Sequence, residues 1–303
     1  MNLRLWANSR AYLLPPKRAI SVRAFSSLGF INPRPRYQVV SLPPGTTPPV
    51  SGLPRITHKI RFYTMSSDKV QPNGMPASKP VLFFDIDNCL YPRSTRVQEL
   101  MAKLIDEYFE KHLSLSQEDA NKLHNEYYRN YGLALEGLVR HHRIDSLEYN
   151  SKVDDALPLE DVLNPNPELR QLLEDIDRNK VTVWLFTNAY VNHGRRVVRL
   201  LGVDDLFEGL TYCDYAQYPL VCKPSKEMYL KAMREAGVER PEDCFFVDDS
   251  YLNCQKAQEY GWTVAHLVEE GFPLPKTPSC KYQIRHLREL RDTFPQFFKS
   301  TQS

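Results

Sequence analysis

Long apolar runs and paired cysteines are both missing from this sequence of 303 residues. No apolar stretch approaches the ~20 residues that a membrane-spanning helix needs, so we expect no membrane span. The six cysteines include no C-x-x-C pair, which argues against a zinc site and against a disulfide framework. Reduced thiols inside a cell fit this pattern better, and we expect a cytoplasmic protein, with the nucleus as a further compartment.

Acidic residues are absent from the first 67 positions, which contain ten Lys or Arg. The remainder carries 29 basic against 37 acidic residues, so the net charge of +2 conceals an acidic body. Because nucleic acids are bound through clustered Lys and Arg, this acidic body argues against a nucleic acid polymer as partner. It does not exclude a small anionic substrate that is held through a metal ion.

The N-terminal region has the composition of a targeting or unfolded segment. Residues 1–40 are rich in Arg, contain Ser and lack acids, which is typical of a mitochondrial transit peptide. The alternatives are a disordered tail, or upstream sequence that is not always translated, with Met65 as an internal start. Residues 41–78 form a Pro-rich linker that cannot bury enough apolar surface to fold alone. A mitochondrial location is expected if the basic segment directs import.

The rest of the chain is organised around a short apolar run that ends in two acids. Residues 81–84 are apolar and lead directly into Asp85 and Asp87, which are separated by Ile86. Such a run predicts a strand that is buried on both faces, as in a parallel sheet, and strand alternation points both carboxylates to one side. Two carboxylates this close repel each other unless a proton or a cation such as Mg²⁺ lies between them. The alternative is a surface turn with two solvated acids.

Helix and strand patterns then follow in a regular order. Helical spacing is found at 94–113, 116–130, 133–143 and 146–152, and no strand pattern interrupts residues 93–164. Beyond them, helices are predicted at 167–179, 192–202, 251–260 and after Ser225 as an N-cap, and strands at 181–186, 209–212, 244–247 and 263–268. This alternation predicts an α/β fold with a doubly wound parallel sheet. We assign residues 79–92 and 165–295 to this core and residues 93–164 to an inserted helical subdomain.

Polar side chains follow three of the predicted strands at their carboxyl ends. A doubly wound sheet brings such ends into one crevice, which is where open α/β sheets bind their ligands. The side chains expected there are Asp85, Asp87, Thr187, Asn188, Lys223, Asp248 and Asp249. Taken singly, each has an ordinary explanation, such as a helix cap, a turn or a solvated lysine. Taken together at strand ends, they predict a site for phosphoryl chemistry.

The carboxylates suit distinct tasks in that chemistry. Asp85 can attack phosphorus as a nucleophile, and Asp248 and Asp249 complete the oxygen ligation of Mg²⁺. Asp87 is the candidate acid and base, and we expect neighbouring carboxylates to raise its pKa for this role.

The remaining polar groups suit the phosphate. Thr187 and Lys223 offer a hydroxyl and a cation to the phosphoryl oxygens, and Asn188 is a further phosphate-binding candidate. Hydrolysis of phosphomonoesters is among the slowest uncatalysed reactions, with accelerations of up to ~10²¹-fold, so several of these effects are needed at once.

Four stretches of the chain resemble the four motifs of the haloacid dehalogenase superfamily: Phe-Phe-Asp85-Ile-Asp87-Asn88-Cys-Leu, Leu-Phe-Thr187-Asn188, Lys223-Pro224 and Phe-Phe-Val-Asp248-Asp249-Ser. The second acid, Asp87, is typical of the phosphatase branch. More narrowly, Asp-Ile-Asp-Asn-Cys-Leu-Tyr, Asn130-Tyr131-Gly132-Leu133 and Thr-Asn-Ala are similar to the fungal and plant pyrimidine 5′-nucleotidases. The resemblance covers about residues 80–290. It departs from the superfamily at Cys89, where Thr or Val is common, and a small buried thiol fits the same space.

The resemblance implies a Rossmann-like core, a helical cap inserted after the first motif, Mg²⁺ and an aspartyl-phosphate intermediate. It implies these roles: Asp85 as nucleophile and metal ligand, Asp87 as acid/base that lends its backbone carbonyl to the metal, Thr187 and Lys223 as phosphate ligands, Asp248 as metal ligand and Asp249 as its indirect support. In the cap, Tyr131 and His141, with Gly132 and His142 beside them, are the candidate substrate contacts. An aromatic ring there can stack on a pyrimidine base, and the alternative is that Tyr131 only packs against the core.

The sequence therefore predicts a Mg²⁺-dependent phosphatase for nucleoside 5′-monophosphates, with UMP and CMP preferred. One alternative keeps the chemistry and changes the phosphomonoester to lysophosphatidic acid, a sugar phosphate or a pyridoxal-type phosphate. The other alternative is a catalytically idle fold that binds proteins, against which the presence of all the acids argues.

Overall fold

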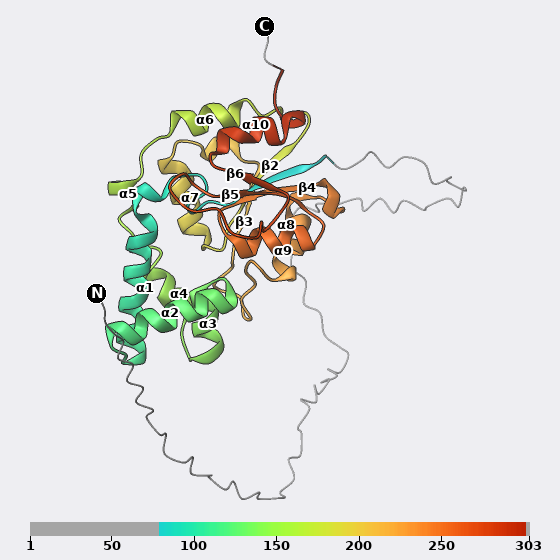
Figure 1. Cartoon of the computed structure of the whole chain (residues 1–303). Coiled ribbons are helices and arrows are strands. Elements are labelled where there is room, and N and C mark those ends of the chain that lie inside the picture. Colours follow the sequence, from blue (N-terminus) through green and yellow to red (C-terminus); the bar gives the residue numbers. More distant parts are fainter. Residues whose placement is uncertain (1–78, 301–303) are drawn as a thin grey trace, which may run out of the picture. The chain divides into compact units, whose positions relative to one another are not determined.

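The computed structural model describes residues 79–300, and the predictions for residues 1–78 lie outside this range. Six strands form one sheet in the order β3-β2-β1-β4-β5-β6, and all neighbouring strands are parallel (Figure 1). The strands are β1 (Val81–Phe84), β2 (Thr182–Phe186), β3 (Gly209–Thr211), β4 (Cys244–Asp248), β5 (Thr263–Leu267) and β6 (Tyr282–Ile284). The predicted α/β class with a doubly wound parallel sheet is confirmed.

Strand β1 lies inside the sheet because all its residues are apolar and can be buried on both faces. None of the four exposes more than 1% of its surface. Leu82 and Phe84 belong to one hydrophobic cluster, whereas Val81 and Phe83 belong to the cluster on the other face. Strands β2 and β3 continue the sheet on one side of β1, and β4, β5 and β6 continue it on the other. The point at which the strand order reverses therefore lies beside β1, where ligands bind in such sheets.

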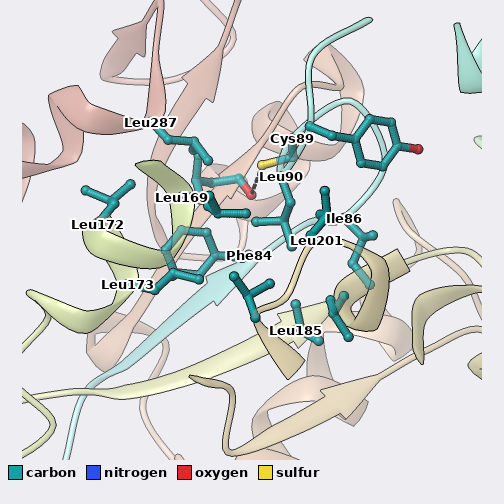
Figure 2. Close-up of a cluster of buried hydrophobic side chains, with 14 of the residues drawn as sticks. Phe84, Ile86, Cys89, Leu90, Leu169, Leu172, Leu173, Leu185, Leu201 and Leu287 are labelled. Carbon is teal, nitrogen blue, oxygen red and sulfur yellow. Dashed lines mark hydrogen bonds between the residues drawn. The ribbon is translucent and has the colours of Figure 1, made fainter. Parts of the chain in front are cut away.

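Helices cover both faces of this sheet. On the face of Phe84, α6 (Pro167–Glu174), α7 (Val191–Leu200) and α10 (Leu290–Thr293) complete the cluster, part of which Figure 2 shows. On the other face, α8 (Lys226–Ala236) and α9 (Tyr251–Glu259) pack against the sheet. Full burial of a side chain such as Phe84 is worth roughly 1.5–3 kcal/mol. Together these contacts fix the strand ends that carry the polar residues.

Residues 93–164 contain helices and turns only. They are η1 (Arg93–Thr95), α1 (Val97–Leu113), α2 (Gln117–Tyr131), α3 (Ala134–His141), α4 (Ser146–Lys152) and α5 (Leu159–Val162). Phe109, Tyr127 and Leu135 form a third cluster, together with Cys213 and Tyr215 from the loop after β3. The helical segment thus has its own core, which includes residues of the loop after β3. Within residues 79–300, no helix is both long and apolar enough to cross a membrane.

The C-terminal part holds the remaining short elements and one unpredicted strand. The 3₁₀ turns are η2 (Asp204–Leu206), η3 (Pro241–Asp243), η4 (Leu287–Glu289) and η5 (Pro295–Phe297). Strand β6 has only three residues, two of which are half-buried, so it shows no clear apolar run. Phe298 is buried in the cluster of Phe84, which carries the core three residues beyond the predicted boundary at 295.

The predicted end of the helix that begins at Pro167 is wrong. Helix α6 ends at Glu174 instead of residue 179, because the following backbone bonds to the C-terminal segment. Asp177 N donates to Phe297 O at 2.8 Å, and Lys299 N donates to Asp175 O at 2.9 Å. Ser225 is the N-cap residue of α8, as predicted, but its hydroxyl makes no capping bond, and its buried Oγ has no partner among the described residues.

Candidate active site

The structure brings the predicted polar residues to one end of the sheet. Asp85 follows β1, Thr187 follows β2, and Asp248 ends β4, and β1 pairs with both of the other strands. A cavity of about 310 Å³ opens at these strand ends. Its lining includes all seven predicted residues: Asp85, Asp87, Thr187, Asn188, Lys223, Asp248 and Asp249. The convergence follows from topology alone, since these residues are spread over more than 160 positions.

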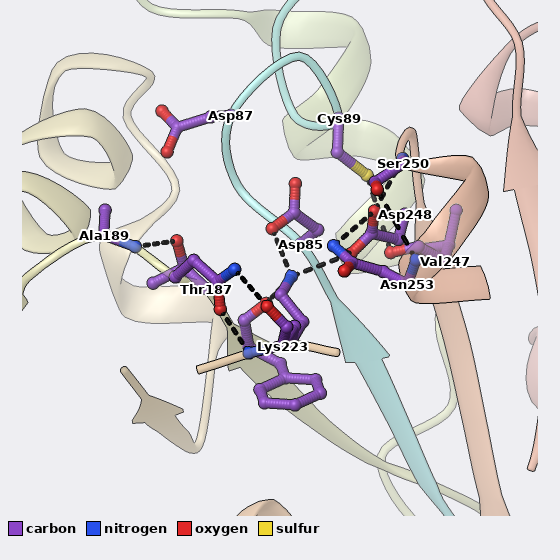
Figure 3. A network of polar contacts seen from close by, with 12 residues as sticks. Asp85, Asp87, Cys89, Thr187, Ala189, Lys223, Val247, Asp248, Ser250 and Asn253 are labelled. Carbon is purple, nitrogen blue, oxygen red and sulfur yellow. Dashed lines mark hydrogen bonds and ion pairs between the residues drawn. The ribbon is translucent and has the colours of Figure 1, made fainter. Parts of the chain in front are cut away.

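Lys223 is the most buried cation of the site and has three oxygen partners (Figure 3). Its Nζ donates to Asp85 Oδ1 at 2.7 Å, to Asp248 Oδ2 at 2.7 Å and to Phe186 O at 2.8 Å. Burial lowers the pKa of Lys223, but the two carboxylates raise it more strongly, so the side chain is an ammonium ion. All three of its N–H groups are thus used on protein oxygens, which ties Asp85 to Asp248 across the sheet.

Asp85 combines a fixed position with one open oxygen. Only 7% of the residue is exposed, and its backbone N–H donates to Val247 O at 3.0 Å. Oδ1 is held by Lys223, whereas Oδ2 has no hydrogen-bond partner among the described residues and points away from the lysine in Figure 3. Burial raises the pKa of Asp85 well above its usual range, against the lowering effect of Lys223. A further positive charge beside it would favour the carboxylate form.

The second acid pair is held by groups that sequence reasoning did not single out. Asp248 is fully buried, and it accepts Ser250 N–H at 2.7 Å and the amide of Asn253 at 3.1 Å. Arg93 donates to Asp249 Oδ2 at 2.5 Å from the turn that begins the helical segment. Burial raises the pKa of Asp249 to about 7, with a further contribution from Asp248. Asn253 follows Asp248 closely in the chain, on the first turn of α9. Nothing in the sequence pattern indicates that Arg93 is a partner of Asp249.

Three of these carboxylates fit a divalent cation. Asp85, Asp248 and Asp249 can each offer one oxygen, and these oxygens lie within 4.8 Å of one another. Lys223 pairs with Asp85 and Asp248, and Arg93 pairs with Asp249, so two cations face three carboxylates, and the group retains an excess of negative charge that a hard cation would balance. Asp249 joins this group directly, whereas the resemblance gave it an indirect role. The carboxylate of Asp87 is not part of it.

Asp87 lies in different surroundings from those predicted. Its Oδ1 accepts from Tyr91 Oη at 2.6 Å and from His193 Nε2 at 2.7 Å. Burial raises the pKa of Asp87, but His193 and the hydrogen bond from Tyr91 outweigh it, and the net shift is downward. The expectation of a raised pKa is therefore wrong for this structure. The carboxylate turns toward His193 and Tyr91 instead of toward the other acids, and the spacing of the motif gave no sign of this.

The two residues after β2 have different roles. Thr187 is 1% exposed, and its Oγ1 accepts Ala189 N–H at 3.0 Å, which leaves the hydroxyl hydrogen available to a ligand. Asn188 was predicted to bind phosphate, but its side chain is used by the backbone of Lys223. Oδ1 accepts Lys223 N–H at 2.7 Å, and Nδ2 donates to Lys223 O at 2.8 Å. Asn188 therefore positions the lysine.

Of the four predicted cap contacts, Gly132 lines the cavity, whereas Tyr131, His141 and His142 do not. Tyr131 Oη and His141 Nε2 are 2.6 Å apart and bond to each other, and neither residue lines the cavity. The helical segment contributes other residues to the lining, among them Gln98, Asn125 and Tyr128. Apolar periodicity identified α2 as a helix, but it did not determine which of its aromatic residues faces the cavity.

Asp154 is a further acid of the cavity wall that sequence reasoning missed. It is 2% exposed, and its Oδ2 has no hydrogen-bond partner within residues 79–300. Burial raises the pKa of Asp154 to about 6, against the lowering effect of His193. It lies beyond α4 in a stretch with no recognisable motif.

Known proteins match this chain at the level of family, sequence and structure. A family model described as haloacid dehalogenase-like hydrolase matches residues 80–261, which is more than half of the chain. "Phosphate metabolism protein 8" of Saccharomyces cerevisiae is 40% identical over 208 residues, or 66% of this chain. The matched stretch is 64% of that protein, so the chain spans less than two thirds of this curated relative.

Two solved structures are similar to the chain at low sequence identity. A HAD phosphatase from Thermococcus onnurineus is 18% identical, with 71% of this chain and 97% of that chain covered and a TM-score of 0.49. An L-2-haloacid dehalogenase from Xanthobacter autotrophicus is 16% identical, with 72% and 98% covered and a TM-score of 0.43.

Proposed function

The chain belongs to the haloacid dehalogenase-like hydrolase family, and from this premise we propose that it hydrolyses phosphomonoesters through Asp85. The resemblance of its four motifs to this superfamily is confirmed. One observation carries the proposal: Asp85 Oδ1 is tied to Lys223 while Oδ2 is free beside the cavity. A carboxylate oxygen that is held in place, unshared and next to a cation is a suitable nucleophile.

The reaction has two steps, each of which uses residues of the cavity. In the first, Asp85 Oδ2 attacks phosphorus, the P–O ester bond breaks, and the leaving oxygen takes a proton from Asp87. In the second, water attacks the phosphorus of the aspartyl phosphate, Asp87 takes a proton from that water, and the Asp85–phosphorus bond breaks. Thr187 donates its hydroxyl to a phosphoryl oxygen, and the charge of Lys223 offsets the negative charge that collects near Asp85.

Asp87 must carry a proton in the first step, although its pKa is lowered in the free protein. A phosphate dianion in the cavity counteracts the lowering of this pKa, because a nearby negative charge disfavours the ionised carboxyl. We therefore expect substrate binding to raise the pKa of Asp87.

We propose Mg²⁺ as the cofactor, held by Asp85, Asp248 and Asp249, with the backbone carbonyl of Asp87 as a further ligand. When bound, such an ion neutralises phosphoryl charge and orients the phosphate for in-line attack. Burial raises the pKa of Asp85 and of Asp249, and a bound cation would give their anionic forms a counter-charge, which supports this assignment.

For the substrate, we propose a nucleoside 5′-monophosphate with a pyrimidine preference, and we propose that residues 93–164 act as a cap that selects it. Tyr128 offers an aromatic face, and Gln98 and Asn125 offer amides that can pair with a base. The yeast relative is named for phosphate metabolism, which agrees with a phosphate ester as substrate. A sugar phosphate, a pyridoxal-type phosphate and lysophosphatidic acid are the alternatives.

A panel of phosphate release tests this proposal. The full chain is assayed with UMP, CMP, AMP, GMP, ribose 5-phosphate, pyridoxal 5′-phosphate and lysophosphatidic acid, each with Mg²⁺ and with EDTA. We expect the highest kcat/KM with UMP or CMP, and loss of turnover in EDTA. Faster turnover of a non-nucleotide would remove the nucleotidase assignment but retain the phosphatase. No release from any ester, or release that EDTA leaves unchanged, would contradict the enzyme or the cofactor assignment.

We propose a reducing compartment, the cytoplasm or nucleus, with mitochondria as the alternative if the basic N-terminal segment directs import. The support is that all six cysteines are buried thiols without a disulfide among residues 79–300. Imaging of the full chain with a C-terminal fluorescent tag separates these locations, and a secreted product would contradict both.

A further inference from the structure

The candidate acid/base has two oxygens in unequal surroundings. Asp87 Oδ1 accepts two hydrogen bonds, from Tyr91 Oη at 2.6 Å and from His193 Nε2 at 2.7 Å. Oδ2 has no hydrogen-bond partner within residues 79–300, the side chain remains 31% exposed, and the residue lines the cavity. The carboxylate thus has one oxygen fixed by the protein and one that is open to a ligand.

From this geometry we propose that His193 and Tyr91 are positioning residues, which hold Asp87 by Oδ1 so that Oδ2 exchanges the proton with the leaving oxygen and with water. The inference rests on the proposed acid/base role of Asp87. Oδ1 already receives two donated hydrogens, so a proton on that oxygen would point at one of its donors. The proton of the neutral acid therefore belongs on Oδ2, which is the oxygen that substrate can reach.

Both donors are themselves fixed. His193 is fully buried on α7, and Tyr91 is 3% exposed in the loop after β1. Helix α7 comes close to that loop at Gly194, where an added Cβ would lie 3.2 Å from Ile86 Cδ1. Because Ile86 stands between Asp85 and Asp87, this contact packs α7 against the motif itself. His193 therefore reaches Asp87 from a rigid element, which is the support that a catalytic group requires.

A purely structural role explains His193 less well. Nδ1 of this buried ring has no partner among the described residues, so its polar nitrogens are not both satisfied as in a histidine of the core. Its one hydrogen bond to a side chain in this part of the protein is the bond to Asp87.

The experiment compares substrates that differ in their need for the acid. UMP and ribose 5-phosphate release alkoxides that must be protonated, whereas p-nitrophenyl phosphate releases a stable phenolate. The value of kcat/KM reports the first chemical step and not the later hydrolysis of the aspartyl phosphate. We expect His193→Leu to lower kcat/KM for the alkyl phosphates by on the order of 10²-fold, and that for p-nitrophenyl phosphate only slightly.

Further variants separate positioning from folding. His193→Gln places an amide donor near the position of Nε2 and should restore part of the loss, whereas Tyr91→Phe removes a single hydroxyl and should show a weaker selective loss. Val197→Ala perturbs the buried face of the same helix and should change kcat/KM by the same factor for all substrates. Asp87→Asn should show the largest selective loss.

The outcomes are distinguishable. A selective loss in Asp87→Asn without one in His193→Leu and Tyr91→Phe would overturn the positioning role and leave the proposed function intact. An equal loss for all substrates in Asp87→Asn would overturn the acid role, and the positioning role with it. Selective loss in His193→Leu with partial recovery in His193→Gln supports the proposal.

Discussion

The end of the sheet and the helical segment hold their polar residues in different ways. At the sheet, Lys223 and Asp85 are 138 positions apart and meet at 2.7 Å, and both are almost completely buried. In the helical segment, Tyr131 and His141 are ten positions apart and bond at 2.6 Å in an exposed setting. Long-range strand order determines the first contact, whereas the rotation of a single helix pair determines the second.

Under the proposed function, the end of the sheet carries the chemistry, and the helical segment selects the substrate. Asp85, Asp248 and Lys223 stabilise one another in a buried setting, so none of them can be changed alone without a loss of stability. In the helical segment, the cavity residues Gln98, Asn125 and Tyr128 are exposed. Changes at the sheet should therefore affect folding and rate together, and changes in the helical segment should affect substrate binding.

Removal of the shared cation should have the largest effect on stability. Lys223→Met leaves Asp85 and Asp248 buried with no partner on that side, and we expect a loss of about 3–5 kcal/mol in the free energy of unfolding. Denaturant unfolding measures it, with the exposed Lys226→Met as the matched control, for which we expect a change within about 0.5 kcal/mol. Equal losses in the two variants would show that the buried ion pairs do not hold the sheet end together.

The contact between the two regions is tested next, at Gly132. This glycine has φ 77°, and an added Cβ would lie 2.6 Å from both Lys223 O and Pro224 Cδ. Gly132→Ala combines left-handed strain with overpacking, so we expect a loss of about 2–4 kcal/mol in stability and a lower kcat.

Gly237 provides the control for that substitution. Its φ is 71°, but nothing lies within 4 Å of an added Cβ. Gly237→Ala should therefore cost only the backbone strain, about 1–2 kcal/mol, and leave kcat unchanged. A kcat that is equally low in both variants would show that the contact between residue 132 and the Lys223 loop does not determine the rate.

Asp154 should give the stability a pH dependence. Because burial raises its pKa from 3.8 to about 6, the folded state binds this proton more tightly than the unfolded state. The resulting stabilisation is complete below pH 3.8 and is lost as the pH rises through about 6, and it amounts to about 3 kcal/mol at most. Asp154→Asn should remove this component, so the stability difference between the two proteins should change by most of that amount between pH 4 and pH 7.5, measured in EDTA. A constant difference would contradict it.

The smallest effects are expected at two tyrosines of α2. Tyr128→Ala removes an aromatic face from the cavity and should raise KM for UMP about fivefold, with stability nearly unchanged. Tyr131→Phe removes the hydroxyl that bonds His141, and it should leave KM unchanged and cost about 0.5–1.5 kcal/mol of stability. If Tyr131→Phe raised KM for UMP and Tyr128→Ala left it unchanged, Tyr131 would be the substrate contact, as the sequence predicted.

The sequence was informative where burial and topology determine position. Residues 81–84 form β1 as predicted, because a run of apolar residues can be buried on both faces. The meeting of Asp85, Thr187 and Asp248 follows from parallel strands with a common carboxyl edge. Strand β6 was not predicted because its sequence has no clear apolar run, and its extended conformation comes from pairing with β5.

Side-chain partners were less predictable. The contact of His193 with Asp87 depends on how far α7 approaches the loop after β1, and no residue spacing encodes that distance. Asn188 is adjacent to Thr187, yet its amide bonds to backbone atoms 35 positions away. Helical periodicity predicted α2 but not which aromatic residue on it faces the cavity, since Tyr127, Tyr128 and Tyr131 suit a core position and a cavity position equally well.

The central claim is that Asp85 accepts the phosphoryl group, and trapping of that adduct tests it most directly. The full chain is mixed with UMP and Mg²⁺, quenched in acid within one turnover, and treated with borohydride, which reduces an aspartyl phosphate to homoserine. Mass spectrometry should find homoserine at position 85, and Asp85→Asn should show none and lose activity by on the order of 10⁴-fold or more. Homoserine at another aspartate, or turnover that survives in Asp85→Asn, would contradict the account.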